Sequence, residues 1–337
     1  MVALSDLVIG LEVAGSLLII LFLGFLLGYL SYLDSQALSV IVFYVSRVAL
    51  PASLFFGIAP FAFEERAIPT ILTVLFATIL VIFLILPICI LLRFSLGGIG
   101  LAIFSVTSGN VIVLTAPIIE VLFPEDPFYI NQFVIYTLYP SLVLMLPLSI
   151  FLFSLDQDRR NGNGVSSVVV NRALFSVITN PNVIAMFLGT LFAIIPLPVV
   201  SVFSFTLQSL AGTTSPLGVF SVGLAISTIN LRQLLESLFG LPLVYLFFKM
   251  FLLPILALPW VVVFGMSSTD VRVLVLYLSA PTAIASFVLA HSFSIGKGEE
   301  RDHTMIVAVS LALQTVVFFV VILLFTVILN AFGWFVD

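Results

Sequence analysis

The feature that most constrains this chain is a succession of apolar stretches, each about as long as a membrane is thick. A helix needs roughly 20 consecutive apolar residues to cross the hydrocarbon core of a bilayer. Hydrophobic residues make up 62% of the chain and charged residues only 8%, against about 25% charged residues in a soluble domain. We therefore predict an all-α polytopic membrane protein with ten transmembrane helices. The expected spans are 8–30, 36–61, 67–93, 97–123, 126–154, 174–197, 203–228, 238–264, 271–293 and 304–332.

The longest polar connector, residues 155–173, separates five expected spans from five others. We expect a first five-helix repeat at 1–154, a short cytoplasmic connector at 155–173 and a second five-helix repeat at 174–337. Because each half has an odd number of spans, the halves enter the membrane in opposite directions. Homologous halves would then form a 5+5 inverted repeat.

Two short sequence matches favour this repeat, although apolar segments produce chance matches easily. Phe22-Leu23-Gly24 recurs as Phe187-Leu188-Gly189, 165 residues later. Pro51 with Phe55 recurs as Pro216 with Phe220 at the same offset.

The basic residues of the connectors predict the orientation, because cytoplasmic connectors carry an excess of Lys and Arg. With both termini on the non-cytoplasmic side, the cytoplasmic connectors contain seven basic residues and the opposite side two. The seven are Arg93, Arg159, Arg160, Arg172, Arg232, Lys297 and Arg301, and the two are Arg66 and Arg272. The N-terminus lacks the basic region of a cleaved signal peptide, so we expect the first apolar stretch to be retained.

Two of the expected spans are interrupted near their middle, one in each half. Span 97–123 breaks at Ser108-Gly109-Asn110, and span 271–293 breaks at Ala280-Pro281-Thr282. Irregular backbone at membrane depth persists only where protein or a water-filled cavity surrounds it. Two such breaks in corresponding places indicate the substrate site of a secondary transporter.

Asn110 is the leading candidate for a substrate contact. Gly109 permits the backbone to leave the helix, and a new half-helix from Val111 would direct its free N–H groups and positive dipole end at a bound anion. The alternative is an asparagine that only hydrogen-bonds a neighbouring span.

Pro281 and Thr282 form the second break, because proline removes a backbone donor and clashes with the preceding turn. A simple kink is the alternative. Pro51, followed by Ser53, and Pro216 would bend two further spans, either to line the cavity or for structural reasons alone.

Three further polar residues lie within expected spans. Lys249 must face protein or water, since a central charge costs at least ~2.5–3.5 kcal/mol; it either balances an anionic substrate or caps free carbonyls of a broken helix. Arg47 has the same two interpretations. His291 either couples transport to protons or is an interfacial histidine without that role.

Span 126–154 carries a polar group, Asn131, Gln132, Tyr136 and Thr137, of which at least one is expected at the cavity. No enzyme motif is present, so we expect no catalytic function. One cysteine and two histidines in separate regions predict no metal site, and nothing suggests a cofactor or a nucleic acid partner.

Five short motifs, in order and at the expected spans, resemble those of the auxin efflux carrier family, which includes plant PIN carriers and bacterial malate or malonate permeases. The motifs are Leu50-Pro51-Ala52-Ser53-Leu54-Phe55, Asn110 through Pro117, Thr179-Asn180-Pro181-Asn182, Phe248-Lys249-Met250 with Leu253-Pro254, and Ala280-Pro281-Thr282-Ala283 through Ala290.

The resemblance covers almost the whole chain and implies a particular arrangement. Spans 1, 2, 6 and 7 would form a scaffold, and spans 3–5 and 8–10 a transport domain that moves like an elevator. Spans 4 and 9 would cross at Gly109-Asn110 and Pro281-Thr282, with Asn131 near a polar substrate contact. The resemblance also implies a homodimer and a small organic carboxylate as substrate.

The chain departs from the family pattern at several positions. Gly109 stands where family members often have proline, and Thr115 replaces a glycine. Plant carriers pair a lysine, at the position of His291, with an aspartate in span 3, and residues 67–93 contain no acid. Proton or charge coupling therefore cannot be carried over from the resemblance.

The sequence thus predicts a secondary transporter or facilitator for a small organic anion, auxin-like or a dicarboxylate, in the plasma membrane or an internal membrane such as the ER. One alternative is a transporter-like sensor that binds a ligand without net flux. Another is a bile-acid-type sodium symporter, which would need acidic residues near the breaks, and none lies close to either.

Overall fold

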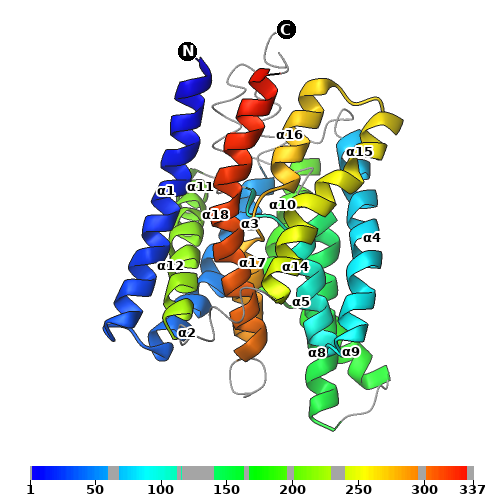
Figure 1. The fold of residues 1–337 in the computed structure, drawn as a ribbon. Helices are drawn as coiled ribbons and strands as arrows, with labels where there is room; N and C mark the ends of the chain where they lie inside the picture. The colour runs from blue at the N-terminus through cyan, green and yellow to red at the C-terminus, as the bar shows by residue number, and fades with distance from the viewer. Residues whose placement is uncertain are drawn as a thin grey trace.

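The structure, a computed structural model, describes residues 2–59, 68–111, 115, 140–162, 167–195, 201–228, 240–294 and 301–331. All regular elements in these ranges are helices, and most run roughly along one direction (Figure 1). Those of the first half are α1 (Val2–Tyr29), α2 (Ser35–Tyr44), the π-helical turn η1 (Val45–Ala49), α3 (Leu50–Ile58), α4 (Ile68–Leu91), α5 (Leu96–Thr107), η5 (Pro140–Met145) and α8 (Leu146–Arg160). Those of the second half are α9 (Ser167–Ile178), α10 (Pro181–Ile194), α11 (Ser201–Gly212), α12 (Thr214–Ser227), α14 (Leu241–Leu246), η6 (Phe247–Leu252), α15 (Leu253–Val263), α16 (Ser268–Leu278), α17 (Ile284–Ser294) and α18 (Arg301–Ala331).

Several of these helices are long and apolar enough to cross a membrane, which confirms the expected class of helical membrane protein. Four qualify in the described residues, and α9 with α10, bent by 58°, would make a fifth. The four are Ser35–Ile58, Ile68–Leu91, Ser201–Ser227 and Leu241–Val263. The ten spans and their inverted repeat stay predictions, because other expected spans are broken or continue outside the described ranges.

Local sequence signals begin several helices where they are expected. Asn180 accepts a hydrogen bond from the backbone N–H of Asn182, and Pro181 follows in the first turn of α10, where its missing N–H costs nothing. At α16, Ser267 and Asp270 form a capping box in which each side chain accepts from the other's backbone N–H.

Prolines also explain two of the wide helical turns. Pro51 follows η1 and Pro254 follows η6, each in the first turn of the next helix. The proline ring clashes with the carbonyl of the preceding turn, so that turn widens to i−5 hydrogen bonds. Accordingly, the N–H of Leu50 donates to Val45 O, and the N–H of Leu253 donates to Phe248 O. One consequence is that Lys249 lies in a wide turn.

Glycines bring two pairs of helices into backbone contact. A Cβ on Gly24 of α1 would lie 2.1 Å from Phe220 O of α12, and a Cβ on Gly223 of α12 would lie 1.9 Å from Leu21 O of α1. A Cβ on Gly189 of α10 would lie 3.2 Å from Phe55 O of α3. Side chains larger than hydrogen therefore have no room at Gly24 and Gly223.

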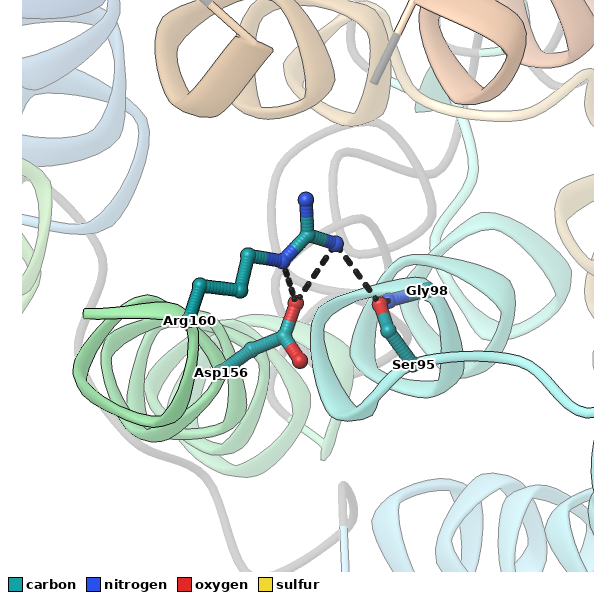
Figure 2. A network of polar contacts seen from close by, with 4 residues as sticks. All are labelled: Ser95, Gly98, Asp156 and Arg160. Atoms are coloured by element: carbon teal, nitrogen blue, oxygen red, sulfur yellow. Dashed lines mark hydrogen bonds and ion pairs between the residues drawn. The ribbon is translucent and has the colours of Figure 1, made fainter. Parts of the chain in front are cut away.

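The expected connector at 155–173 is mostly helical, because α8 continues to Arg160 and α9 begins at Ser167. Ion pairs support these polar helix ends: Arg172 pairs with Asp158, and Arg160 pairs with Asp156 at 3.0 Å. Figure 2 shows Arg160 also donating to Ser95 Oγ at 3.3 Å. Ser95 in turn caps α5 by accepting from the N–H of Gly98, so this network joins α8 to the start of α5.

Candidate functional site

Both predicted breaks are present. α5 ends at Thr107, and Ser108 has extended backbone with φ −97° and ψ 131°. In the second half, α16 ends at Leu278 and α17 begins at Ile284. The helix expected to resume beyond Asn110 lies mostly outside the described residues.

The two breaks pair with each other through their backbones. Gly109 and Thr282 form an isolated antiparallel bridge. We call this bridge and its flanking residues, 108–110 and 281–283, the crossover. Two backbone hydrogen bonds flank the bridge, from Asn110 N to Pro281 O at 2.7 Å and from Ala283 N to Ser108 O at 3.0 Å. These two backbone N–H groups outside the helices are thus satisfied by protein, which is what a membrane interior would require.

Groups from two helices hold the second break, the side chain of Gln314 on α18 and the backbone carbonyl of Ser105 on α5. Thr282 N donates to Gln314 Oε1 of α18 at 2.7 Å. The Thr282 hydroxyl lies 2.8 Å from Ser105 O of α5 and 3.0 Å from Gln314 Oε1, and it can donate to one of them at a time. Thr282 and Gln314 are both fully buried. Gln314 was not predicted from the sequence; its signal is a polar pair with Ser310 at helical spacing in an apolar span.

Lys249 reaches the crossover from η6. Its ammonium donates to Leu278 O, in the last turn of α16, at 2.8 Å, and the residue is 1% exposed. This contact matches one of the two interpretations of Lys249, in which the lysine caps a free carbonyl of a broken helix. A Cβ on Gly109 would lie 3.3 Å from the same nitrogen, so the amine lies directly against the bridge. Within the described residues, no ion pair involves Lys249.

Several buried hydroxyls around the crossover have no hydrogen-bond partner in the part of the chain that the structure describes. They are those of Ser105, Ser108 and Ser286. Buried polar atoms normally have a partner, so these hydroxyls are available to a polar ligand or to water. Asn110 is 8% exposed, and its backbone N–H is already used in the crossover.

The structure does not bring every candidate to this place. His291 lies at the far end of α17, where its Nε2 is 3.5 Å from Ser39 Oγ of α2 and its ring stacks on Phe287. Arg47 is exposed on η1, and Ser53 is half-buried on α3. Among the described residues, no hydrogen bond joins Arg47 or Ser53 to the crossover. Asn131 lies outside the described residues.

Metal chemistry has no evident site in the described ranges, which contain no group of three or more His, Cys, Asp or Glu residues arranged to hold an ion.

Comparison with known proteins identifies the family. The lysosomal cholesterol signaling protein of Mus musculus is 28% identical over 243 residues, which cover 69% of this chain and 27% of that protein. The chain therefore spans about a quarter of the length of this curated relative. The family model described as membrane transport protein matches residues 12–320. Since the match covers nearly the whole sequence, the chain belongs to this family of membrane transporters, the auxin efflux carrier family.

Proposed function

We propose that this protein is a secondary transporter or facilitator that moves a small organic carboxylate anion across a membrane. The observation that carries the proposal is the crossover with the buried amine of Lys249 beside Gly109. A buried ammonium is costly unless it is paired; the described residues supply no acid to Lys249, and a bound carboxylate would neutralise it.

In this proposal the carboxylate lies against Asn110, with Lys249 supplying positive charge from the other side of Gly109. Asn110 offers a side-chain amide donor, and the neighbouring unpartnered hydroxyls of Ser108 and Ser286 offer further donors. Hydrogen bonds to a carboxylate are charge-assisted and therefore stronger than those between neutral groups. The amine of Lys249 has two further N–H groups besides the one that caps Leu278 O.

We further propose an elevator-type movement, with the crossover carried by spans 3–5 and 8–10. The hydrogen bonds around the second break support this division, because Thr282 is bonded to α5 and α18, and Leu278 at the end of α16 is bonded to η6. Toward the proposed scaffold, α17 makes an apolar contact with α12 next to the crossover, where a Cβ on Gly218 would lie 2.4 Å from the Ile284 side chain; its polar contact is at the far end, between His291 and Ser39 of α2. An apolar contact has no directional bonds to break when one group slides past another.

We also propose the inverted repeat, which two glycine–phenylalanine contacts support. Gly24 lies against Phe220, and Gly189 lies against Phe55. The two glycines are 165 residues apart, and so are the two phenylalanines. A two-fold relation between halves produces such an exchange, in which each partner is replaced by its counterpart from the other half.

Both termini are proposed to lie on the non-cytoplasmic side of the plasma membrane or an internal membrane such as the ER. Figure 1 supports an even number of crossings: α1 begins and α18 ends at one end of the molecule, and α8 meets α9 at the opposite end. A homodimer remains a proposal from the family resemblance alone.

A second candidate function is a membrane sensor that binds a ligand without net flux. The similarity to a protein named for cholesterol signaling favours it. Because that relative is far longer than the matched region, its activity is not transferred to this chain as a whole.

Flux into proteoliposomes tests the two functions. Labelled malate, malonate, succinate and indole-3-acetate would be offered to the wild type and to Asn110→Ala, with and without a pH gradient. We expect saturable flux of at least one anion, reduced at least about tenfold in folded Asn110→Ala. Acceleration by the gradient would bring His291 into the mechanism.

Two outcomes would contradict the transport proposal. Thermal stabilisation by cholesterol or by an anion, without flux of any anion, would favour the sensor. Flux that is unchanged in Asn110→Ala would place the site elsewhere.

A further inference from the structure

We infer that Gln314 is a positioning residue for the crossover: its amide oxygen fixes the backbone of Thr282, and thereby the place where Asn110 is presented, without contacting the transported anion. The inference rests on the proposed transport function for its consequence. Its structural part concerns how the second break is held.

The pattern of the bridge turns two backbone donors away from the pair, the N–H groups of Gly109 and Thr282. The flanking bonds, Asn110 N to Pro281 O and Ala283 N to Ser108 O, mark the widely spaced type of antiparallel pair. In such a pair the N–H groups of the two central residues point away from each other. The N–H of Thr282 therefore points away from Gly109, into protein where it is fully buried.

Gln314 supplies the acceptor that this donor requires. Its Oε1 accepts from Thr282 N at 2.7 Å and lies 3.0 Å from the Thr282 hydroxyl. Its Nε2 donates to Ser310 Oγ, one turn earlier on α18, at 2.7 Å. Because a backbone N–H can only donate, the oxygen of the amide must face Thr282. The bond to Ser310 then holds the amide in that orientation.

The position of Thr282, which Gln314 fixes, determines the position of the first break through the bridge. The N–H of Asn110 donates to the carbonyl of Pro281, which is the residue next to Thr282. If Thr282 lost its acceptor, a buried N–H would be left unsatisfied, and the second break would move towards another partner. Asn110 would move with it, although no bond between Gln314 and Asn110 exists in the described residues.

Cysteine labelling tests the positioning role without any substrate. The single native cysteine, Cys89, would be replaced in Cys89→Ala, and Asn110→Cys introduced in that background. Asn110 is only 8% exposed, so reaction with N-ethylmaleimide is expected to be slow. Gln314→Leu, which removes the acceptor at similar volume, should raise the labelling rate about tenfold. Gln314→Glu keeps an acceptor and should stay within about threefold of the parent.

Gln208→Leu provides the matched control, because Gln208 lies exposed on α11. It should leave the rate unchanged. Equal rates in Gln314→Leu and Gln208→Leu would overturn the inference. If Gln314→Leu does not fold, Ser310→Ala replaces it, since freeing the amide to rotate should raise the rate about threefold, and an unchanged rate would again overturn the inference.

Transport of labelled malonate, or of whichever of the four anions shows flux, separates this inference from the proposed function. Gln314→Leu should raise KM about tenfold with a smaller change in kcat, since it displaces binding groups without removing them. A wild type with no flux, combined with faster labelling in Gln314→Leu, would refute the transport proposal and keep Gln314 as the residue that holds the crossover. Flux with unchanged KM in Gln314→Leu would refute the positioning role alone.

Discussion

The contact between α1 and α12 and the crossover are two places where distant parts of the chain meet through their backbones, and they are built differently. Between α1 and α12, Gly24 and Gly223 remove side-chain volume, and the facing backbones touch. At the crossover, directed hydrogen bonds hold the segments, and the atoms nearest a Cβ on Gly109 belong to side chains at 3.1–3.3 Å. The contact between α1 and α12 therefore depends on shape, and the crossover depends on polarity.

The largest effect is expected from adding volume to the contact between α1 and α12. Gly24→Ala would place a methyl group 2.1 Å from a backbone oxygen, so the helices must separate. We expect a loss of stability of about 3 kcal/mol, at the upper end of the usual range for overpacking. The measurement is the temperature at which half the detergent-solubilised protein ceases to be monodisperse.

Gly15→Ala is the control on the same helix, since no atom lies within 4 Å of a Cβ there. It should stabilise the protein slightly, because alanine favours helix by about 0.5–1 kcal/mol over glycine. Equal behaviour of the two variants would show that shape does not govern this contact.

Removing the buried charge should impair transport more than stability. Lys249→Met keeps most of the volume but leaves Leu278 O without its donor and the anion without its positive partner. We expect kcat/KM for the transported anion to fall about 100-fold, which corresponds to roughly 2.7 kcal/mol. The same substitution at exposed Arg47 is the control, and a comparable loss in Arg47→Met would contradict the assignment of the site.

A polarity change at the crossover should be destabilising even though volume is kept. Thr282→Val removes the hydroxyl that lies 2.8 Å from Ser105 O, and we expect a cost of about 1–3 kcal/mol in stability. Thr282→Ser retains the hydroxyl and should cost less. If the two variants have the same melting temperature, the hydroxyl does not hold the second break.

The smallest effect is expected from a small volume change at the crossover. In Gly109→Ala the new methyl group meets Val111, Ala280 and the amine of Lys249 at 3.1–3.3 Å, and the flexible lysine can yield. We expect a loss of about 1 kcal/mol or less in stability, near the lower end of the overpacking range. A loss as large as that of Gly24→Ala would remove the distinction between the two contacts.

The sequence allowed the breaks to be predicted, because glycine, asparagine and proline interrupt apolar segments where a regular helix would otherwise continue. It also offered the carbonyl cap as one interpretation of Lys249, since a central charge needs a nearby partner. Both features are local, and neither depends on which helices are neighbours.

Features that depend on neighbours were not predictable. Gln314 is 32 residues from Thr282, and nothing in its own span indicates which donor it meets. Lys249, Arg47 and His291 were all candidates in the sequence, but His291 lies near Ser39 and Arg47 is exposed. One residue of helix register decides whether a polar side chain faces the crossover or the outside, and apolar segments in a membrane carry little periodicity to fix that register.

The crossover has one consequence for the rates at which backbone protons exchange with solvent. Peptide groups outside regular helices ordinarily exchange quickly, because no neighbouring turn shields them. The amides of Asn110 and Ala283 are each bonded to a carbonyl of the opposite break. They can exchange only when the two breaks separate, so their deuterium uptake reports how often the centre of the molecule opens.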